Sequence, residues 1–402
     1  MIELVHRIQK LFELMVKQAS QIIYFPGTIS TYSGHCIAGS CRFHIKASCE
    51  DVAKKKAVVL GATGMMGQKF VQLLSSHPWF EVSAVAASDR SVGKQYGDTV
   101  GSKGGNGITK ELGSLEVVEA KPRAIEDPDV AFSALPAEVA SPIEDEFAKA
   151  GMPVFSNASS HRMDEYVPLL NPEVNSEHAV MVEKQKRRLK RDGFIVANPN
   201  CTTAILTLSL KPLYQEFGLE TVIVSSMQAI SGAGYPGVAS IDILENVIPF
   251  IRNEEEKVER ETNKILGTPT SPADITVSAS CHRVPTIHGH IEAVFAKTRS
   301  PATPQAVGER MARFQSVPQK LKLPSAPAQP IIVRTEEDRP QTRGGRQRRR
   351  RNERERWPNP SRRSFQRCKI HRSRAQPRQR RSGMLNPERR TLPRSKVHSV
   401  MK

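Results

Sequence analysis

The chain has 402 residues, of which 38% are hydrophobic and 25% charged, a composition that predicts a globular protein of two or three domains. Its net charge of +18 suggests a nucleic-acid binder, but 23 of the 59 Lys and Arg residues and only 3 of the 41 acidic residues lie between Arg339 and Lys402. This segment therefore carries a net charge of +20, and the rest of the chain carries −2. Outside this segment the protein is close to neutral and not basic. No stretch approaches about 18 consecutive apolar residues, so we expect no membrane span.

The cysteines follow no metal-binding pattern. No C-x-x-C occurs, so we expect no metal site. Charged residues interrupt the first apolar stretch, which argues against a secretory signal. We therefore expect a cytoplasmic protein with free thiols. The six cysteines are Cys36, Cys41, Cys49, Cys201, Cys281 and Cys368.

Residues 1–53 differ in pattern from the α/β sequence after them. Apolar residues recur at helical spacing near the start, which allows a transit peptide or a surface-binding helix. Glu3 and Glu13 argue against a transit peptide, because such peptides are poor in acidic residues. We expect a non-essential extension ahead of the first domain.

Residues 54–200 alternate strand and helix patterns. Strands are predicted at Ala57–Leu60, Glu81–Ala86 and Asp129–Pro136, and two later segments, "MPVFSNASSHR" and "GFIVANPN", repeat the pattern of a strand ending at a turn. Strands that alternate with helices at this spacing indicate a parallel sheet. The sequence therefore predicts an α/β fold that begins with a Rossmann dinucleotide-binding domain.

A glycine-rich turn separates the first predicted strand from a helix. Gly61 permits the tight turn, Gly64 lets backbone N–H groups approach a pyrophosphate, and Gly67 allows the helix to pack close to the sheet. A purely structural turn is the alternative. The residues expected to contact the dinucleotide here are Gly61, Thr63, Gly64, Met65, Met66 and Gly67.

The end of the second strand indicates which nucleotide binds. An acidic residue there typically holds the ribose hydroxyls of NAD. The chain has Ser88, Asp89, Arg90 and Ser91, and an arginine with two hydroxyls suits a 2′-phosphate, although Asp89 is the opposite signal. We therefore expect NADP (NADPH) rather than NAD.

"NPNCTT" places Cys201 where a strand ends and a helix begins. The dipole of a helix N-terminus stabilises a thiolate, so we expect a lowered thiol pKa, which allows Cys201 to be a nucleophile. Asn198 or Asn200 can cap this helix. The alternative is a small buried residue in the first turn.

Residues 201–339 read as a second α/β domain. A helix follows Cys201, "ETVIVSSMQAI" is a long strand, "LENVIPFIRNEEEKVERETNKIL" carries a charged helix, and His290–Thr298 is again a strand. Residues 340–402 lack apolar periodicity and are arginine-rich, so we expect a disordered tail.

Polar residues of this second domain could serve Cys201. His282, His288 and His290 are candidate bases, and Arg283 could hold a carboxylate. Other candidates are Gln228 as a donor to a carbonyl oxygen, Ser231 and Gly232 beside a nicotinamide, and Glu254 with Lys257 on one helix face. A surface histidine, a strand-end amide and a solvated charged face are the alternative interpretations. Cys281 is expected to be a buried thiol.

These stretches together resemble the aspartate-semialdehyde dehydrogenase family, in particular its archaeal and fungal-like branch. The matching motifs are "GATGMMGQKF", "AASDRSVGKQYGD", "SNASSHRM", "VPLLNPEVN", "NPNCTT", "SSMQAISGAGYPG", "NVIPFIRNEEEK" and the Arg283–His290 segment. They cover roughly residues 54–339. The resemblance implies a two-domain architecture like that of glyceraldehyde-3-phosphate dehydrogenase, with a Rossmann domain and an α/β catalytic and dimerisation domain.

The resemblance also implies roles for individual residues. Cys201 would be the nucleophile, His290 the general acid/base and Gln228 an orienting residue. Arg283 would hold the substrate carboxylate, Glu254 the substrate amine, and Lys257 would lie at the phosphate site. The implied reaction is NADPH-dependent reduction of aspartyl phosphate to aspartate semialdehyde, with release of phosphate, by a homodimer or homotetramer. It serves lysine, threonine and methionine biosynthesis.

The C-terminal part departs from the family. Family members end with an "HNTIRGAAG"-like segment that returns to the first domain, and we find none after "IIVRTEEDRPQTR". A reading-frame shift near Gly344 is the simplest hypothesis, and it predicts impaired activity. Two alternatives remain: a related acyl-CoA reductase such as malonyl-CoA reductase, or an inactive basic protein whose tail binds nucleic acid non-specifically.

Overall fold

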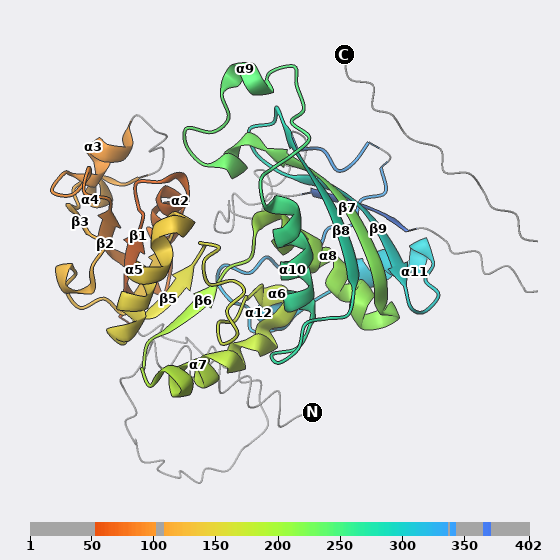
Figure 1. Cartoon of the computed structure of the whole chain (residues 1–402), viewed down its shortest axis with the longest axis horizontal. Coiled ribbons are helices and arrows are strands. Elements are labelled where there is room, and N and C mark those ends of the chain that lie inside the picture. The colour runs from red at the N-terminus through yellow and green to blue at the C-terminus, as the bar shows by residue number, and fades with distance from the viewer. Residues whose placement is uncertain (1–52, 102–107, 337, 343–364, 371–402) are drawn as a thin grey trace, which may run out of the picture. The chain divides into compact units, whose positions relative to one another are not determined.

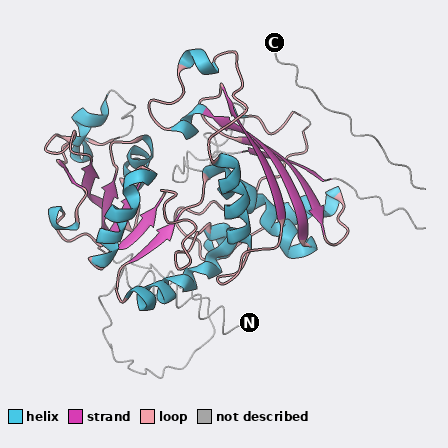
Figure 2. Cartoon of the chain, viewed as in Figure 1, coloured by secondary structure: helices cyan, strands magenta, loops and turns pink. Residues whose placement is uncertain are grey.

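The computed structural model describes residues 53–101, 108–336, 338–342 and 365–370. Two β-sheets organise these residues, one of six strands and one of four (Figures 1 and 2). The predicted N-terminal extension, up to residue 52, lies outside the described residues, as does most of the predicted tail. The division of the chain at residues 200 and 201 stays a prediction.

The first sheet has the strand order β3-β2-β1-β4-β5-β6, and all its neighbouring pairs are parallel. This is the strand order of a dinucleotide-binding fold, so the predicted Rossmann sheet is confirmed. The short β3 was not predicted. The strands are β1 (Lys55–Leu60), β2 (Phe80–Ala87), β3 (Val117–Glu119), β4 (Val130–Ser133), β5 (Pro153–Ser156) and β6 (Phe194–Ala197).

Helices connect these parallel strands. The first, α2, buries Gly67, Val71 and Leu74, whose spacing of four and three residues forms one apolar face. Buried apolar side chains of β1, β2 and α2 form the core beneath the glycine turn. The helices are α2 (Met65–Leu74), α3 (Tyr96–Val100), α4 (Lys110–Gly113), α5 (Ala137–Lys149), α6 (Pro172–Asn175) and α7 (Met181–Leu189), with 3₁₀ turns at Pro122–Ala124 and Ser176–Val180.

The second sheet is mixed, in the order β10-β9-β7-β8. Its central strand β7 (Leu219–Ala229) runs parallel to β8 (Thr276–Val284) and antiparallel to β9 (Ile291–Thr298). Helices α8 (Cys201–Phe217) and α10 (Glu254–Leu266) contact this sheet (Figure 1). The remaining elements are the 3₁₀ turn η4 (Ile230–Ala233), α9 (Ser240–Ile243), α11 (Pro304–Ala312) and α12 (Val317–Lys320).

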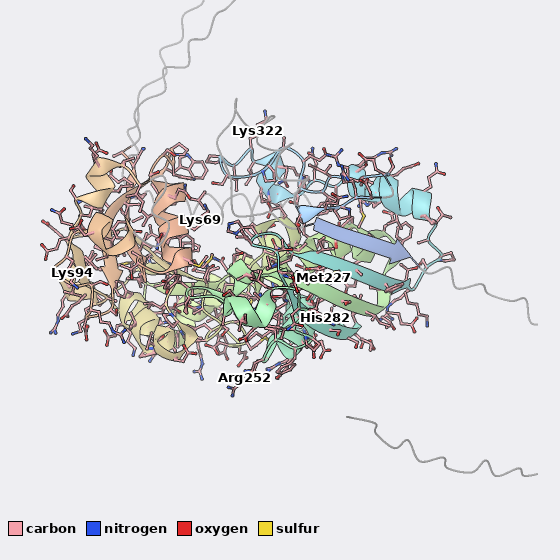
Figure 3. All side chains as sticks on the ribbon, turned by 90° about the horizontal axis from the view of Figure 1, so that it is seen from above. Lys69, Lys94, Met227, Arg252, His282 and Lys322 are labelled. Atoms are coloured by element: carbon pink, nitrogen blue, oxygen red, sulfur yellow. The ribbon has the colours of Figure 1, made fainter. Side chains whose placement is uncertain are left out.

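Alternation along β7 gives this sheet a covered and an open face. Val222, Val224 and Ser226 are buried, whereas Ile223 between them is 53% exposed. Met227 and His282 form a cross-strand pair and both are labelled in Figure 3. Because side chains alternate along a strand, their neighbours in sequence, Gln228 and Arg283, point to the covered face.

The strand β10 (Phe365–Ile370) corrects the prediction of a tail disordered throughout. It pairs in parallel with β9, with Phe365 opposite Ile291 and Ile370 opposite Ala296. The edge of β9 offers backbone N–H and C=O groups that another strand can pair with, and such pairing needs no apolar periodicity in the added segment. Sequence patterns therefore could not predict it.

No helix within the described residues is long and apolar enough to cross a membrane.

Candidate functional site

The glycine turn joins β1 to α2 at the carboxyl edge of the first sheet. Gly61 has a φ of +73°, and a Cβ there would lie 2.7 Å from the Ala134 carbonyl oxygen. A Cβ on Gly67 would lie 2.1 Å from the Gly61 carbonyl oxygen. Both positions therefore exclude any side chain, for the reasons that the sequence predicted.

Gly64 is the N-cap of α2, and only the Gly61 carbonyl, at 3.4 Å, would meet a Cβ on it. The protein leaves space at this helix N-terminus, where backbone N–H groups and the helix dipole favour an anion. The turn thus fits a dinucleotide pyrophosphate. Buried Tyr96 supports it from below, because its hydroxyl donates to the Ala62 carbonyl at 3.0 Å.

The residues predicted to choose the nucleotide follow β2 directly. Ser88 and Arg90 are exposed, and the Ser91 N–H donates to the Ser88 carbonyl at 2.9 Å, which closes a tight turn. Lys94, labelled in Figure 3, donates its ammonium to the Arg90 carbonyl at 2.8 Å. The turn therefore presents a second cation, which the sequence interpretation did not single out.

Cys201 and His290 meet although 89 residues separate them. Cys201 is the first residue of α8, and His290 directly precedes β9. The His290 Nε2 lies 3.2 Å from the Cys201 Sγ. The Ala229 N–H donates to Nδ1 at 3.0 Å, so a neutral ring carries its proton on Nε2, facing the sulfur. His282, a second candidate, instead places its Nδ1 3.3 Å from the Ser226 carbonyl.

The electrostatics of this pair differ from the prediction. Burial, with the nearby Glu254 carboxylate, raises the pKa of the Cys201 thiol to about 11. The predicted net lowering is therefore wrong. Hydrogen bonding by Thr202 at the helix start does lower the thiol pKa, but burial and the Glu254 charge outweigh it, although part of the cysteine stays exposed. Burial, with the Arg283 charge, lowers the pKa of His290 to about 4.

The Asn200 side chain orients the start of α8 through three hydrogen bonds. Its Oδ1 accepts hydrogen bonds from the N–H groups of Thr202 and Thr203, at 2.8 and 3.2 Å. Its Nδ2 donates to the Glu254 Oε1 at 2.8 Å, and the same oxygen accepts from the Gln228 Nε2 at 3.1 Å. The predicted cap is thus Asn200, and the buried residues Gln228 and Glu254 lie beside the nucleophile candidate.

Arg283 and the loop after β7 form the other wall of the site. The Arg283 Nη1 donates to the Ala229 carbonyl at 2.9 Å. A Cβ on Gly232 would lie 2.8 Å from that Nη1 and 3.4 Å from the His290 Cε1. A side chain at Gly232 would therefore displace the Arg283 guanidinium. The Ser231 N–H donates to the Ile287 carbonyl at 3.1 Å, which ties the loop to the segment before His290.

Two predicted residues take no part in the hydrogen bonds of this cluster. Lys257 shares helix α10 with Glu254, but no hydrogen bond or ion pair joins its side chain to the other described residues. Cys281 is 1% exposed, and its N–H donates to the Glu255 Oε1 at 2.9 Å. Its thiol is buried, as predicted, and within the described part of the chain no acidic, histidine and cysteine side chains are grouped to hold a metal ion.

The sequence interpretation missed Arg162 and Glu261. Arg162 follows β5 and forms an ion pair with Glu261 of α10, with Nη1 2.9 Å from Oε1. The Glu261 Oε2 accepts from the Asn200 N–H at 2.7 Å, and the Arg162 charge favours the Cys201 thiolate. Only the motif "SNASSHRM" drew attention to this loop, and no local signal pairs residues 99 positions apart.

Comparisons with known proteins agree with this geometry. Residues 56–181 match the family model of the semialdehyde dehydrogenase NAD-binding domain, and residues 210–352 match that of the semialdehyde dehydrogenase dimerisation domain. The predicted nicotinamide cofactor and the predicted two-domain class are thereby confirmed. The second match extends past Gly344, where the predicted departure from the family begins.

The similar proteins include aspartate-semialdehyde dehydrogenases and a malonyl CoA reductase. Aspartate-semialdehyde dehydrogenase of Archaeoglobus fulgidus is 53% identical over 289 residues, which cover 71% of this chain and 82% of the relative. The enzyme of that name from Schizosaccharomyces pombe is 45% identical over 73% of this chain and 85% of its own. Malonyl CoA reductase (NADP) of Metallosphaera sedula is 40% identical over 71% and 82%.

Among solved structures, aspartate semialdehyde dehydrogenase with NADP from Candida albicans is similar with a TM-score of 0.68 and 42% identity. The match covers 73% of this chain and 86% of that one. The family models, the archaeal and fungal relatives and the fold all point to the family that the motifs around Cys201 and His290 indicate. The chain belongs to the aspartate-semialdehyde dehydrogenase family of oxidoreductases.

Proposed function

We propose that this chain catalyses NADPH-dependent reductive dephosphorylation of L-aspartyl 4-phosphate to L-aspartate 4-semialdehyde, through a thioester on Cys201. One observation carries the proposal: the Cys201 Sγ lies 3.2 Å from the His290 Nε2, in a chain 53% identical to the aspartate-semialdehyde dehydrogenase of Archaeoglobus fulgidus. A thiolate that displaces phosphate from an acyl phosphate divides one difficult substitution into two easier steps.

The start of α8 limits where the oxyanion of the first step can be held. The N–H groups of Thr202 and Thr203 already donate to the Asn200 Oδ1. Among the first backbone N–H groups of this helix, the Cys201 N–H is the one that no described acceptor uses. We assign it the role of holding the oxyanion, with the Gln228 amide orienting the reacting carbonyl.

His290 is the proposed general acid/base. Its Nε2 is the atom that exchanges a proton with the sulfur and with the oxygen of the reacting carbon. In the neutral ring Nε2–H donates to the sulfur, which suits a thiolate acceptor. Accepting a proton at Nε2 requires the other tautomer, which costs the hydrogen bond from the Ala229 N–H.

The charged residues around the pair suit an amino-acid substrate. We assign the α-carboxylate to Arg283, the α-amine to Glu254 and the phosphate to Lys257, whose side chain no described residue engages. A carboxylate needs a guanidinium and an ammonium needs an acid, and both stand within one cluster. This set favours an aspartyl phosphate over a CoA thioester.

NADP is the proposed cofactor, as in the Candida albicans structure with NADP. When bound, the nicotinamide supplies the hydride that reduces the thioester carbon. The glycine turn would hold the pyrophosphate, and Ser231 and Gly232 would lie at the nicotinamide. Ser88, Arg90 and Ser91 would bind the 2′-phosphate.

The first experiment offers the purified chain two substrate pairs and follows NADPH absorbance. We expect turnover with aspartate semialdehyde, phosphate and NADP, and none with malonyl-CoA and NADPH. A higher rate with malonyl-CoA would overturn the substrate assignment and favour the reductase that is 40% identical. We also propose that turnover is lower than that of the archaeal relative assayed beside it, because of the departing C-terminal segment.

The proposal extends to the oligomeric state and to the cellular compartment. The dimerisation-domain match implies an oligomer, and we propose a homodimer or homotetramer that works in the cytoplasm, where a nucleophilic thiol stays reduced. We propose no biological role in nucleic-acid binding, although 23 cations would bind nucleic acid non-specifically and with strong salt dependence.

A further inference from the structure

One face of α10 reaches both loops that carry the site. Glu254, Glu261 and Lys264 are seven and three residues apart, so they lie along one side of the helix. Glu254 accepts from the Asn200 side chain, and Glu261 accepts from the Asn200 backbone. The residue before the nucleophile is thus held from the same helix by two carboxylates.

Glu261 uses both of its oxygens. Its side chain is 2% exposed; Oε1 accepts from the Arg162 Nη1 at 2.9 Å, and Oε2 accepts from the Asn200 N–H at 2.7 Å. The guanidinium of Arg162 also donates through Nη2 to the Asn157 carbonyl at 2.8 Å. A buried ion pair with this geometry fixes its partners firmly, because releasing either one would leave a buried charge unpaired.

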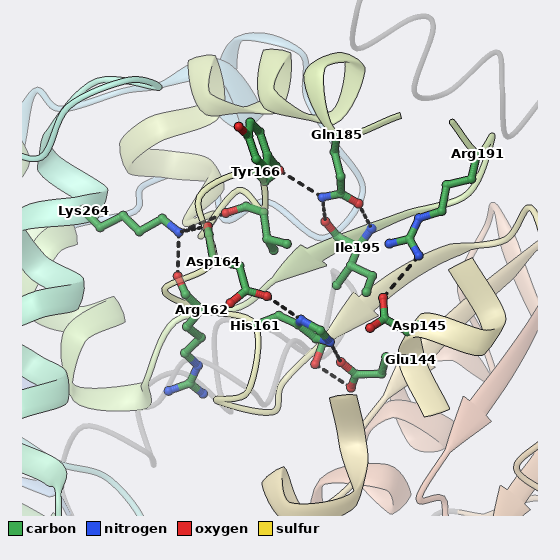
Figure 4. A network of polar contacts seen from close by, with 12 residues as sticks. Glu144, Asp145, His161, Arg162, Asp164, Tyr166, Gln185, Arg191, Ile195 and Lys264 are labelled. Carbon is green, nitrogen blue, oxygen red and sulfur yellow. Dashed lines mark hydrogen bonds and ion pairs between the residues drawn. The ribbon is translucent and has the colours of Figure 1, made fainter. Parts of the chain in front are cut away.

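The backbone of the Arg162 loop has its own support. The Lys264 ammonium donates to the carbonyls of Arg162, Asp164 and Val167, at 2.7, 2.8 and 3.0 Å (Figure 4). Lys264 therefore holds the path of the loop, whereas Glu261 holds the guanidinium at its end. The two roles are separable by mutation.

We propose that Glu261 is a positioning residue for the nucleophile: it holds the Arg162 guanidinium and fixes the Asn200 backbone at the start of α8, next to Cys201. This inference rests on the proposed function of Cys201. Glu261 does not contact the sulfur in the structure, so it acts through Arg162 and Asn200.

The expected effect on the thiol is one of charge. Arg162 favours the Cys201 thiolate, against the burial and the Glu254 charge that raise the thiol pKa. If Glu261 is neutralised, Arg162 loses its ion pair and keeps only the hydrogen bond to the Asn157 carbonyl, so its guanidinium can move away from the start of α8. The thiolate then forms at higher pH, although a negative charge has been removed from the surroundings.

The test measures alkylation of Cys201 by iodoacetamide against pH in the full chain, with the Cys201 peptide quantified by mass spectrometry. We expect Glu261→Gln to raise the thiol pKa by about 0.5–1 pH unit, within the range that loss of a nearby opposite charge produces. Because the whole interval from pH 8 to pH 10 lies below the thiol pKa, the labelling rate at each pH should then fall about three- to tenfold. Glu261→Gln in an Arg162→Met background should add no further fall, since residues acting through one another are not additive. An unchanged or higher labelling rate for Glu261→Gln overturns the proposal.

Controls separate positioning from folding and from the substrate assignment. Glu256→Gln removes an exposed carboxylate of the same helix that pairs with Arg260, and should leave the labelling rate unchanged. If Glu261→Gln does not fold, Glu261→Asp keeps the charge on a side chain one methylene shorter. We then expect a smaller rise of the Cys201 thiol pKa, and no rise overturns the proposal. Alkylation needs no substrate, so a chain inactive on aspartate semialdehyde can still show the shift.

Discussion

The Cys201 thiol and the His290 imidazole are both neutral at neutral pH. The pKa of the thiol is raised to about 11 and that of the ring lowered to about 4, in each case mainly by burial. The free protein therefore holds a neutral pair rather than a preformed thiolate and imidazolium. Binding a substrate with a phosphate group and a carboxylate would add charges that alter both values.

This state predicts how Cys201 reacts in the free protein. Because the thiol pKa is raised, the thiolate fraction should still grow about tenfold per pH unit from pH 7 to pH 10. Iodoacetamide labelling of the Cys201 peptide should therefore rise throughout this interval. A plateau reached by pH 8 would contradict the structure and support the lowering expected from the helix dipole.

Of Cys201 and Cys281, only Cys201 should matter for turnover. Cys201→Ser removes the thiolate nucleophile, and we expect turnover to fall by at least about 10³-fold. Cys281→Ala removes a buried thiol outside the site and should leave turnover within about twofold, with a modest loss of stability. Steady-state rates of the two variants check this. Comparable losses in both would remove Cys201 from its proposed role.

At the scale of the elements, local signals carried the prediction where they were strong. The glycines at 61, 64 and 67 between an apolar strand and a helix fixed β1 and α2, because each glycine answers a local steric need. The strand β8 went unpredicted, since its polar sequence "TVSASCHRV" is a strand only through its pairing with β7. Arg162 and Glu261 meet only in the folded chain, so no sequence pattern could join them.

The close packing of the glycine turn predicts opposite effects at two helical glycines. Gly67→Ala would bring a Cβ to 2.1 Å from a backbone oxygen, so we expect a loss of unfolding free energy of about 1–3 kcal/mol and weaker NADP binding. Gly308→Ala in α11 meets nothing within 4 Å, and should stabilise by about 0.5–1 kcal/mol.

Urea unfolding and NADP titration of both glycine variants measure these effects. Equal stability of the Gly67→Ala and Gly308→Ala proteins would show that the turn is not packed as described.

At the scale of the whole molecule, the open face of the second sheet suits a partner subunit. Ile223 and Phe295 form a cross-strand pair and are 53% and 40% exposed. Exposed apolar side chains gathered on one face mark an interaction surface, and the family model for this region is a dimerisation domain. The site lies on the covered face, so a partner on the open face leaves it accessible.

A charge on that face should dissociate the oligomer. We expect Phe295→Lys to lower the mass measured by sedimentation equilibrium toward that of one chain, because an interface buries such a charge without a partner. Leu189→Lys, at an exposed apolar position on α7, is the matched control and should leave the mass unchanged. An unchanged mass for Phe295→Lys would place the interface elsewhere.

The central claim is that Cys201 carries the acyl group of the substrate. The most direct measurement incubates the chain with aspartate semialdehyde and NADP, without phosphate, and maps the adduct by mass spectrometry after acid quenching. Omitting phosphate removes the acceptor that would release the thioester. We predict an aspartyl group on the Cys201 peptide. It should be absent from the Cys201→Ser protein and should be released when phosphate is added. NADPH formation without any adduct on Cys201, or an adduct on another cysteine, would contradict this role for Cys201.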